Sequence, residues 1–443
     1  MRVVIVGAGK VGYTLAEHLT EEDHDVIVIE EDETRRNTVQ DSLDVMTIQG
    51  NGASPKVLMN PDVRSANLMI AVTDSDEVNM VACMAAKQVG IAQTIARIRN
   101  IEYIGRDETE LHHLLGIDLT INPEHATAVE ISRILMIPAA LEVEDFAGGR
   151  VRLVEVRIGP DSPLINIPLA ELNLPDNVLI VGIVRKEKMI IPHGSDKLIA
   201  YDNVFFVGEP AALQEIQVDF TEAFSRVQKV LIIGAGRIGR YLAQRLEQSG
   251  MSVKVIDKDP ERCQYLATLL KKGSVFCGDG TDMDLLTEEG AGGADAVVCL
   301  TDDDKLNLLL ALLAKELGAK RTIVRVGRTE YIPLLEKVGV DVVVSPRLIT
   351  AGVILSQVRR GKFVAISLLE GAKAQAMEIL VSEETRIRNK KLEDIKFPRN
   401  CLVGAVVRNG KVFVPDGQTI LQDGDRAVVF ALSDSISKME KIF

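Results

Sequence analysis

The feature that most constrains the fold of this chain is a glycine-rich phrase that occurs twice. The first copy, "IVGAGKVGY", runs from Ile5 to Tyr13, and the second, "IIGAGRIGR", runs from Ile232 to Arg240. Each copy follows an apolar run and precedes a segment with helical spacing. In that setting the pattern Gly-x-Gly-x-x-Gly indicates the turn of a dinucleotide-binding fold. The chain must therefore build two such turns, half of its own length apart.

The repetition extends far beyond the glycines and comprises two kinds of block. In the first kind, block A, the phrases "QGNGA" and "VTDSDEVN" reappear as "CGDGT" and "LTDDDKLN". In the second kind, block B, "VGIVRKEKMIIPHG" reappears as "VGAVVRNGKVFVPDG". The blocks follow one another in the order A-B-A-B. Matches at a nearly constant spacing indicate an internal duplication of structure.

Block A alternates strands with helices. Its first copy contains the β-branched apolar runs "VVIVG", "VIVIE", "VMTIQ", "LMIAVT", "TIARI" and "LTIN", separated by stretches long enough for a helix. Runs that are apolar throughout are buried on both faces, which predicts a parallel, doubly wound sheet between layers of helices. Six strands in about 120 residues fit a Rossmann domain. Block B has short alternating strands and turn signals such as "RNGK" and "PDGQ", which predicts a small α+β module.

We therefore expect an α/β protein in which each of two Rossmann domains is followed by a small α+β domain. The expected boundaries are 1–123 and 227–346 for the Rossmann domains, 142–226 and 363–443 for the small domains, and 124–141 and 347–362 for the linking helices. The linking segments "EHATAVEISRILMI" and "RLITAGVILSQV" have apolar residues at helical spacing, so one face of each needs a cover. We expect the two helices to cover each other, or to cover another subunit.

The glycine phrases predict two sites for a nucleotide diphosphate. The first glycine makes the tight turn, the second lets a pyrophosphate approach the backbone, and the third lets helix and strand pack closely. The phosphates then lie on the unpaired amides at the helix start. Lys10 and Arg237 either contact a terminal phosphate or are solvated. The expected phosphate-binding residues are Gly7, Ala8, Gly9, Lys10, Val11 and Gly12 in the first copy, and Gly234, Ala235, Gly236, Arg237, Ile238 and Gly239 in the second.

An acidic residue ends the second strand of each A block, Glu30 in the first and Asp257 in the second. An acid at this position accepts hydrogen bonds from the ribose hydroxyls and repels a 2′-phosphate. Both sites are therefore predicted to favour NAD(H) or an adenine nucleotide over NADP. The alternative is that the two acids merely face solvent at the end of a strand.

Further matched residues follow the carboxyl ends of later strands, the edge at which doubly wound sheets bind ligands. We expect the residues after the third strand to meet adenosine and the arginines that end the fifth strand to face phosphate charge. For Asp74 and Asp302, capping of the next helix is an alternative to ligand contact. The residues concerned are Asn51, Thr73, Asp74 and Arg97 in the first copy, and Asp279, Thr301, Asp302 and Arg325 in the second.

Composition excludes several classes of protein. With 51 basic and 64 acidic residues the net charge is −13, which argues against binding to a nucleic-acid backbone. No apolar stretch approaches the ~18 residues of a membrane-spanning helix, and the chain starts directly with a strand, so we expect a cytoplasmic protein without a signal peptide. The five cysteines lack a C-x-x-C spacing and are expected to be buried free thiols. The six histidines show no pattern of metal ligands.

The block order and its motifs resemble a known family. A-B-A-B, with G-A-G-x-[IV]-G, an acid after the second strand, "GDGT", "TDDD…N" and an arginine after the fifth strand, resembles the tandem regulator-of-potassium-conductance (RCK, or KTN) proteins. This is the family of peripheral NAD-binding subunits of Trk potassium-uptake systems. The first copy departs from the pattern with Asn51 and Ala53 in "GNGA".

The resemblance implies a regulatory protein without catalytic activity. Its Rossmann domains would bind NAD⁺ or NADH, and in related proteins ATP or ADP. Its chains would form a ring-like homotetramer at the cytoplasmic face of the membrane and gate a transmembrane Trk potassium channel subunit. Glu124 and Arg347 occupy equivalent positions after a proline, so the charge near the two phosphate sites differs. We hypothesise that the two sites prefer different nucleotides.

Two other classes of protein are weighed against a regulator. An NAD-dependent dehydrogenase needs an acid or base placed against the nicotinamide, and the A blocks repeat no such constellation. A redox-sensing repressor is disfavoured by the negative charge and by the lack of a recognisable winged-helix segment. Turnover of NADH would favour the enzyme, whereas co-purification with a membrane transporter would favour the regulator.

Overall fold

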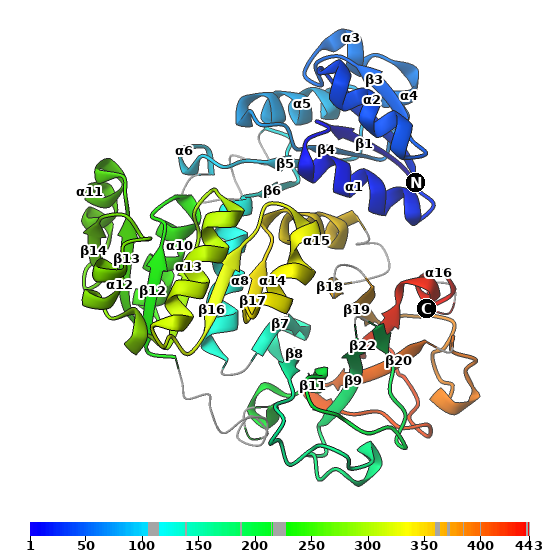
Figure 1. Cartoon of the computed structure of the whole chain (residues 1–443). Helices are drawn as coiled ribbons and strands as arrows, with labels where there is room; N and C mark the ends of the chain where they lie inside the picture. The colour runs from blue at the N-terminus through cyan, green and yellow to red at the C-terminus, as the bar shows by residue number, and fades with distance from the viewer. Residues whose placement is uncertain are drawn as a thin grey trace.

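The computed structural model describes residues 1–104, 115–137, 140–186, 188–213, 215, 227–358, 364–369, 373–383, 385–398, 400–439 and 442. Within them the chain forms two six-stranded sheets that alternate with two five-stranded sheets (Figure 1). We call the six-stranded units the first and second lobe, and the five-stranded units the first and second module. In the described part of the chain no helix is both long and apolar enough to cross a bilayer.

The first lobe is a parallel sheet with the strand order β3-β2-β1-β4-β5-β6. All six strands lie on the apolar runs that predicted them, because each run is buried between helices. The strands are β1 (Arg2–Val6), β2 (Asp25–Glu30), β3 (Met46–Gln49), β4 (Leu68–Ala71), β5 (Gln93–Arg97) and β6 (Leu119–Ile121). The helices are α1 (Lys10–Glu21), α2 (Glu33–Ser42), α3 (Pro55–Leu58), α4 (Pro61–Arg64), α5 (Asp76–Gln88) and α6 (Ile101–Ile104). The predicted doubly wound fold is confirmed.

The second lobe repeats this architecture with the parallel order β14-β13-β12-β15-β16-β17. Its strands are β12 (Lys229–Ile233), β13 (Ser252–Asp257), β14 (Ser274–Cys277), β15 (Ala296–Cys299), β16 (Thr322–Arg325) and β17 (Val342–Val344). Its helices are α10 (Arg237–Gln248), α11 (Pro260–Leu269), α12 (Met283–Glu288), α13 (Asp304–Glu316) and α14 (Ile332–Val338). Both central strands begin the lobe and end at a glycine turn.

The modules are antiparallel sheets that share one core. The first contains β7 (Ala140–Phe146), β8 (Val151–Arg157), β9 (Val178–Arg185), β10 (Lys188–Ile190) and β11 (Asn203–Gly208). The second contains β18 (Ala365–Leu369), β19 (Ala374–Leu380), β20 (Cys401–Arg408), β21 (Lys411–Phe413) and β22 (Arg426–Leu432). The buried rings of Phe205 and Phe430 lie 6.0 Å apart between the two sheets. Asn409 and Gly410 have φ of 51° and 81°, so "RNGK" forms the predicted tight hairpin.

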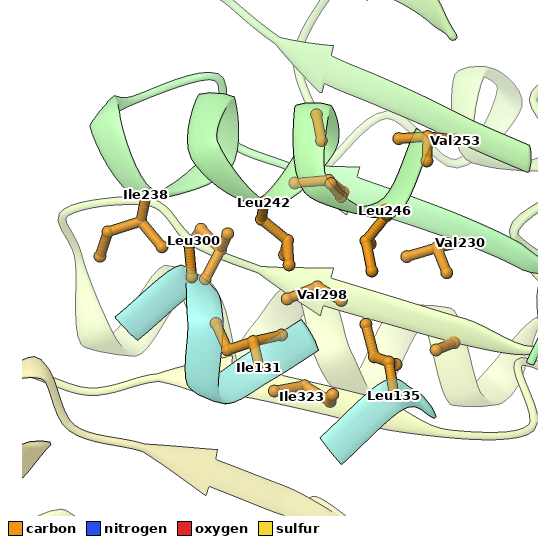
Figure 2. Close-up of a cluster of buried hydrophobic side chains, with 14 of the residues drawn as sticks. Ile131, Leu135, Val230, Ile238, Leu242, Leu246, Val253, Val298, Leu300 and Ile323 are labelled. Carbon is orange, nitrogen blue, oxygen red and sulfur yellow. The ribbon is translucent and has the colours of Figure 1, made fainter. Parts of the chain in front are cut away.

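Two linking helices are exchanged between the lobes. Helix α8 (Pro123–Met136) follows the first lobe but packs on α10 of the second, where Ile131 and Leu135 join one core with Leu242 (Figure 2). Helix α15 (Pro346–Val358) follows the second lobe but packs on α1 of the first. The two helices also contact each other, as predicted. Their packing on the opposite lobe was not predicted.

The cysteines depart from the sequence expectation at one position. Cys83, Cys263 and Cys299 are buried and Cys401 is half-buried. Cys277 is exposed, so the prediction that all five are buried is wrong. The reason is its place at the end of β14, the edge strand of the second lobe, where one side of the sheet lacks a neighbouring strand.

Candidate functional site

Each glycine turn has the backbone geometry that its motif predicts. Gly7 has a φ of +100° and Gly234 a φ of +116°, a region that L side chains rarely adopt. A Cβ on Gly12 would lie 1.9 Å from the carbonyl oxygen of Gly7, and a Cβ on Gly239 would lie equally close to that of Gly234. The third glycine therefore lets the helix pack directly against the turn.

The second glycine of each phrase faces open space instead. Among the residues that the structure describes, a Cβ on Gly9 or Gly236 would meet no atom within 4 Å. Each residue is also the N-cap of its helix, α1 or α10, and provides no side-chain oxygen for the first amides. Unpaired amides at a helix start attract anions. The space beside Gly9 and Gly236 therefore suits a phosphate group.

The strand-two acids are tied to these turns. The Glu30 carboxylate accepts hydrogen bonds from the amide of Ala8 at 2.5 Å and of Asp32 at 3.0 Å. Asp257 accepts the corresponding bonds from Ala235 at 2.6 Å and Asp259 at 2.9 Å. Both acids are more than nine-tenths buried, so they do not simply face solvent. A carboxylate has about four acceptor sites, which leaves lone pairs for the predicted ribose hydroxyls.

Asp74 and Asp302 are not helix caps. Helix α5 is capped by Ser75 and helix α13 by Asp303, one position further along the chain. The helix-capping alternative is therefore wrong. Asp74 instead lies 3.6 Å from the guanidinium of Arg97, and Asp302 lies 3.2 Å from that of Arg325.

The two strand-five arginines have unused donors. The Nε atoms of Arg97 and Arg325 are buried and have no hydrogen-bond partner among the described residues. Burial, followed by the charge of Arg99, lowers the pKa of Arg97. A buried donor without a partner is unfavourable, and an incoming acceptor would remove that cost. Both side chains therefore suit an anionic or oxygen-rich ligand.

The loop after the third strand of each lobe is held by its own side chains. Asn51 accepts a hydrogen bond from the amide of Ala53 at 2.8 Å. Asp279 accepts two from Thr281, through the amide and the hydroxyl, and the amide bond is the main cause of the lowered pKa of Asp279. The phrase "GDGT" therefore differs from "GNGA" by a carboxylate in place of an amide and by one added hydrogen bond from the threonine hydroxyl.

A buried asparagine anchors the threonine after the fourth strand of each lobe. It was not among the predicted site residues. The hydroxyl of Thr73 donates to Asn79 Oδ1 at 2.7 Å, and Asn79 Nδ2 donates to the carbonyls of Thr73 and Arg97. Asn307 makes the same bonds to Thr301 and Arg325. These asparagines join the ends of strands four and five, and their repetition in "TDSDEVN" and "TDDDKLN" was the signal for them.

Both glycine turns open into one cavity of about 1900 Å³. Typical ligand pockets have volumes of about 300–1,000 Å³, so this cavity has room for more than one ligand. Every predicted site residue lines it except Gly12 and Gly239, which lie beneath the turns. The sequence predicts two nucleotide sites, but not that both turns line one cavity.

Cross-lobe contacts surround this cavity. Glu124, at the start of α8, lies 3.9 Å from Arg237 in the second glycine turn. Arg347, at the start of α15, donates a hydrogen bond to Thr14 on α1 of the first lobe. Asn122 donates to the hydroxyl of Tyr241 on α10 at 3.3 Å. The charge difference between "NPE" and "SPR" singled out Glu124 and Arg347 in the sequence. It did not predict that each contacts the opposite lobe.

The fold and the cavity define a class of protein: two Rossmann lobes whose glycine turns face one shared cavity, each followed by a small antiparallel module. Family models agree with this division. The TrkA-N domain matches residues 3–123 and 230–346, and the TrkA-C domain matches residues 153–220 and 376–443. The chain belongs to the TrkA family of Trk system potassium uptake proteins.

Relatives match the chain over its whole length. The Trk system potassium uptake protein TrkA homolog of Archaeoglobus fulgidus is 40% identical over 443 residues, which cover all of both chains. Homolog 1 of Methanosarcina mazei is 39% identical over 451 residues, again covering all of both chains. The TrkA protein of Haemophilus influenzae is 35% identical, covering all of this chain and 98% of its own.

Solved structures share the fold. The GsuK channel covers all of this chain and 78% of its own, with 18% identity and a TM-score of 0.65. The GsuK channel bound to NAD covers the same shares with 19% identity and a TM-score of 0.64. A GsuK structure bound to ADP covers 81% of this chain and 69% of its own, with 17% identity and a TM-score of 0.51.

Proposed function

We propose that this chain is a nucleotide-binding regulatory subunit that gates the membrane subunit of a Trk-type potassium-uptake system. The two glycine turns with their acids, here called the first and second cradle, bind NAD(H) or another adenine nucleotide. The protein performs no chemistry on these ligands. It acts from the cytoplasmic face of the membrane as a ring-like homotetramer.

The observation that carries this proposal is the shared cavity with its cross-lobe contacts. Helix α8 begins at the end of β6 in the first lobe, contributes Glu124 to the cavity, and packs its apolar face on the second lobe. Helix α15 makes the reciprocal connection through Arg347. A ligand that moves either turn therefore changes how the two lobes meet.

Ligand-driven gating requires that a nucleotide bind one arrangement of the lobes more tightly than another. The shift in the equilibrium is limited by that difference in affinity. Coupling energies of about 1–3 kcal/mol are typical between allosteric sites, and they change an equilibrium by about 5- to 150-fold. The family relationship to Trk potassium uptake proteins and the binding of NAD and ADP by GsuK support this assignment.

The two cradles are further proposed to take different nucleotides. Lys10 and Arg347 both line the cavity beside the first cradle, and two cations favour a ligand that ends in a phosphate, such as ADP or ATP. At the second cradle the cation Arg237 is offset by Glu124. Glu124 Oε2 is buried and has no partner among the described residues, so it can accept a hydroxyl of the second ribose of NAD(H).

Charge exchange at the two helix starts tests this difference. Calorimetric titrations with ADP and with NADH compare the wild type, Glu124→Arg and Arg347→Glu. Each protein also carries Gly9→Asp or Gly236→Asp, so that only one cradle is open. Glu124→Arg is expected to shift the second cradle toward ADP, and Arg347→Glu to weaken ADP at the first. Equal affinities of both cradles for both ligands in the wild type would refute the difference.

The regulatory assignment is tested by capture and by turnover. The full chain, immobilised and saturated with NADH, is expected to retain the membrane subunit from detergent-solubilised membranes. In the same buffer, NADH absorbance should stay constant with a panel of hydroxy and amino acids. Steady oxidation of NADH with any of these substrates would favour the dehydrogenase. Loss of capture together with absence of nucleotide binding would contradict the proposal.

A further inference from the structure

Two of the five cysteines lie next to each other in the second lobe. Cys263 is on α11, and Cys277 is the last residue of β14, where it pairs in register with Asp257. The Cys263 sulfur lies 3.2 Å from the carbonyl oxygen of Asp257 and 3.6 Å from that of Phe276. The second of these carbonyls belongs to the peptide bond that leads into Cys277. The Cys263 sulfur therefore lies against the peptide unit that directly precedes Cys277.

Both thiols are on the same side of the sheet. Val275 packs against the hydrophobic cluster that contains Leu266 of α11. Side chains alternate along a strand, so Cys277, two positions later, points to the same face. Burial, followed by the neighbouring Cys277 thiol, raises the pKa of Cys263 to about 11.

We infer that Cys263 and Cys277 form an oxidation site, at which a hydroperoxide or a low-molecular-weight disulfide converts the two thiols into a disulfide at the adenosine edge of the second cradle. Cys277 is exposed and is the thiol that an oxidant reaches. Cys263 is buried beside it and is the resolving thiol.

The chemistry balances with hydrogen peroxide as the oxidant. The Cys277 thiolate attacks one peroxide oxygen, the O–O bond breaks, and a sulfenic acid and hydroxide form. The Cys263 sulfur then attacks the sulfenic sulfur, its proton leaves with the departing hydroxyl as water, and the S–S bond forms. Overall two thiols and one peroxide give one disulfide and two waters. The sulfenic acid is uncharged, so the thiolate charge that opposes ionisation of Cys263 is absent in the second step.

The disulfide changes the second cradle through Asp257. The main-chain carbonyl of Asp257 accepts hydrogen bonds from the amide of Gly278 at 3.0 Å and from the Cys263 thiol. Oxidation removes the thiol donor and draws α11 toward the strand end that precedes Asp279. Because this inference rests on the proposed nucleotide binding, we expect a loss of affinity of about tenfold at the second cradle, the effect of roughly one hydrogen bond.

The first lobe provides an internal control. Arg36 and Gln49 occupy the positions equivalent to Cys263 and Cys277. Arg36 there donates hydrogen bonds to Gln40 and Thr47, and neither side chain can be oxidised to a disulfide. The affinity of the first cradle is therefore expected to be the same in the reduced and the oxidised protein.

The first experiment measures the disulfide alone, independently of nucleotide binding. The folded full chain is treated with hydrogen peroxide, alkylated and analysed by intact mass and peptide mapping. Wild type and the control Cys401→Ser, which replaces a half-buried thiol, should each lose two hydrogen atoms within the peptide pair of Cys263 and Cys277. Cys277→Ser should not, and dithiothreitol should restore the wild type. Unchanged thiols in the wild type, or a disulfide that does not involve this pair, would overturn the inference.

The second experiment measures the consequence for binding. NADH is titrated into reduced and oxidised Gly9→Asp protein, in which only the second cradle is open, and then into the same variant combined with Cys277→Ser. Oxidation should weaken NADH binding about tenfold in the Gly9→Asp variant. It should leave the affinity of the variant that also carries Cys277→Ser unchanged. An oxidised pair with undiminished affinity would refute the link to the cradle. Absence of NADH binding in the reduced protein would instead contradict the proposed function and leave the disulfide chemistry standing on the first experiment.

Discussion

Replacement of Gly9 or Gly236 by aspartate should abolish nucleotide binding at one cradle without loss of the fold. A Cβ at either position would meet no atom of the described residues within 4 Å. Both residues have extended backbone angles, with φ of −65° and −63°, which any residue adopts. Both are N-caps without a side-chain cap bond, and aspartate is among the best N-cap residues. The new carboxylate would therefore bind the amides that the phosphate is expected to use.

The aspartate is expected to stabilise the helix slightly and to weaken nucleotide binding strongly. Relative to glycine, an aspartate cap stabilises a helix by a few tenths of a kcal/mol, and its charge near the helix start adds ~0.3–1 kcal/mol. A carboxylate about 4 Å from a phosphate charge costs ~4 kcal/mol at an effective dielectric constant of about 20. Water in the open cavity reduces this cost, so we expect affinity to fall by at least about 100-fold, or ~2.7 kcal/mol.

The assay combines calorimetry with thermal unfolding. In Gly9→Asp one class of NADH or ADP site should disappear, in Gly236→Asp the other, and in the double variant both. The unfolding temperature without ligand should equal or exceed that of the wild type. Gly9→Ala and Gly236→Ala, which add bulk without charge, are the matched controls and should bind more tightly than the aspartate variants. Wild-type affinity in the double variant would refute the assignment of the cradles, and a lowered unfolding temperature would refute the reasoning on capping.

Three further predictions concern the framework around the cavity. Gly12→Ala places a Cβ 1.9 Å from the Gly7 carbonyl oxygen, so it should lower the free energy of unfolding by about 1–3 kcal/mol in urea titrations, whereas Gly9→Ala should not. Asn79→Leu removes the hydrogen-bond partner of one amide and two carbonyls. It should therefore lower the free energy of unfolding by about 2–4 kcal/mol in the same titrations. Burial and the neighbouring Glu144 raise the pKa of Glu130 from 4.5 to about 8, so the folded chain holds an extra proton between those values and loses stability as pH rises through them. Glu130→Gln should therefore unfold at a higher temperature than the wild type at pH 8.5 and show no such gain at pH 4.5, by calorimetry; an equal gain at both would contradict this.

The lobes could be predicted from sequence because their signals are local. Apolar runs such as "VVIVG" are uniform, since helices cover both faces of the parallel sheet, and the glycine phrases specify backbone shape within a few residues. The acids Glu30 and Asp257 followed from their distance to those phrases. These features depend only on near neighbours in the chain, and the duplication repeated each of them.

The contacts between the lobes could not be predicted in the same way. The apolar face of α8 requires a cover, but its spacing is the same whether α10, α15 or another subunit provides it. The bond between Arg347 and Thr14 joins residues 333 positions apart. The sequence shows Glu124 and Arg347 as a charge difference between the two copies. Their meeting in one cavity depends on contacts with the opposite lobe, which no local pattern predicts. Sequence patterns also do not fix the exact residue at which a helix begins. The N-caps of α5 and α13 are Ser75 and Asp303, one position after Asp74 and Asp302.

Potassium flux through the reconstituted membrane subunit tests the central claim most directly. Vesicles that contain the membrane subunit of the Trk system are supplied with the wild-type chain or with the Gly9→Asp, Gly236→Asp double variant, and flux is recorded with and without NADH and ADP. We predict that nucleotides change the flux by about 5- to 150-fold with the wild type and leave it unchanged with the double variant. The same response with both proteins, or no response with the wild type, would contradict the account.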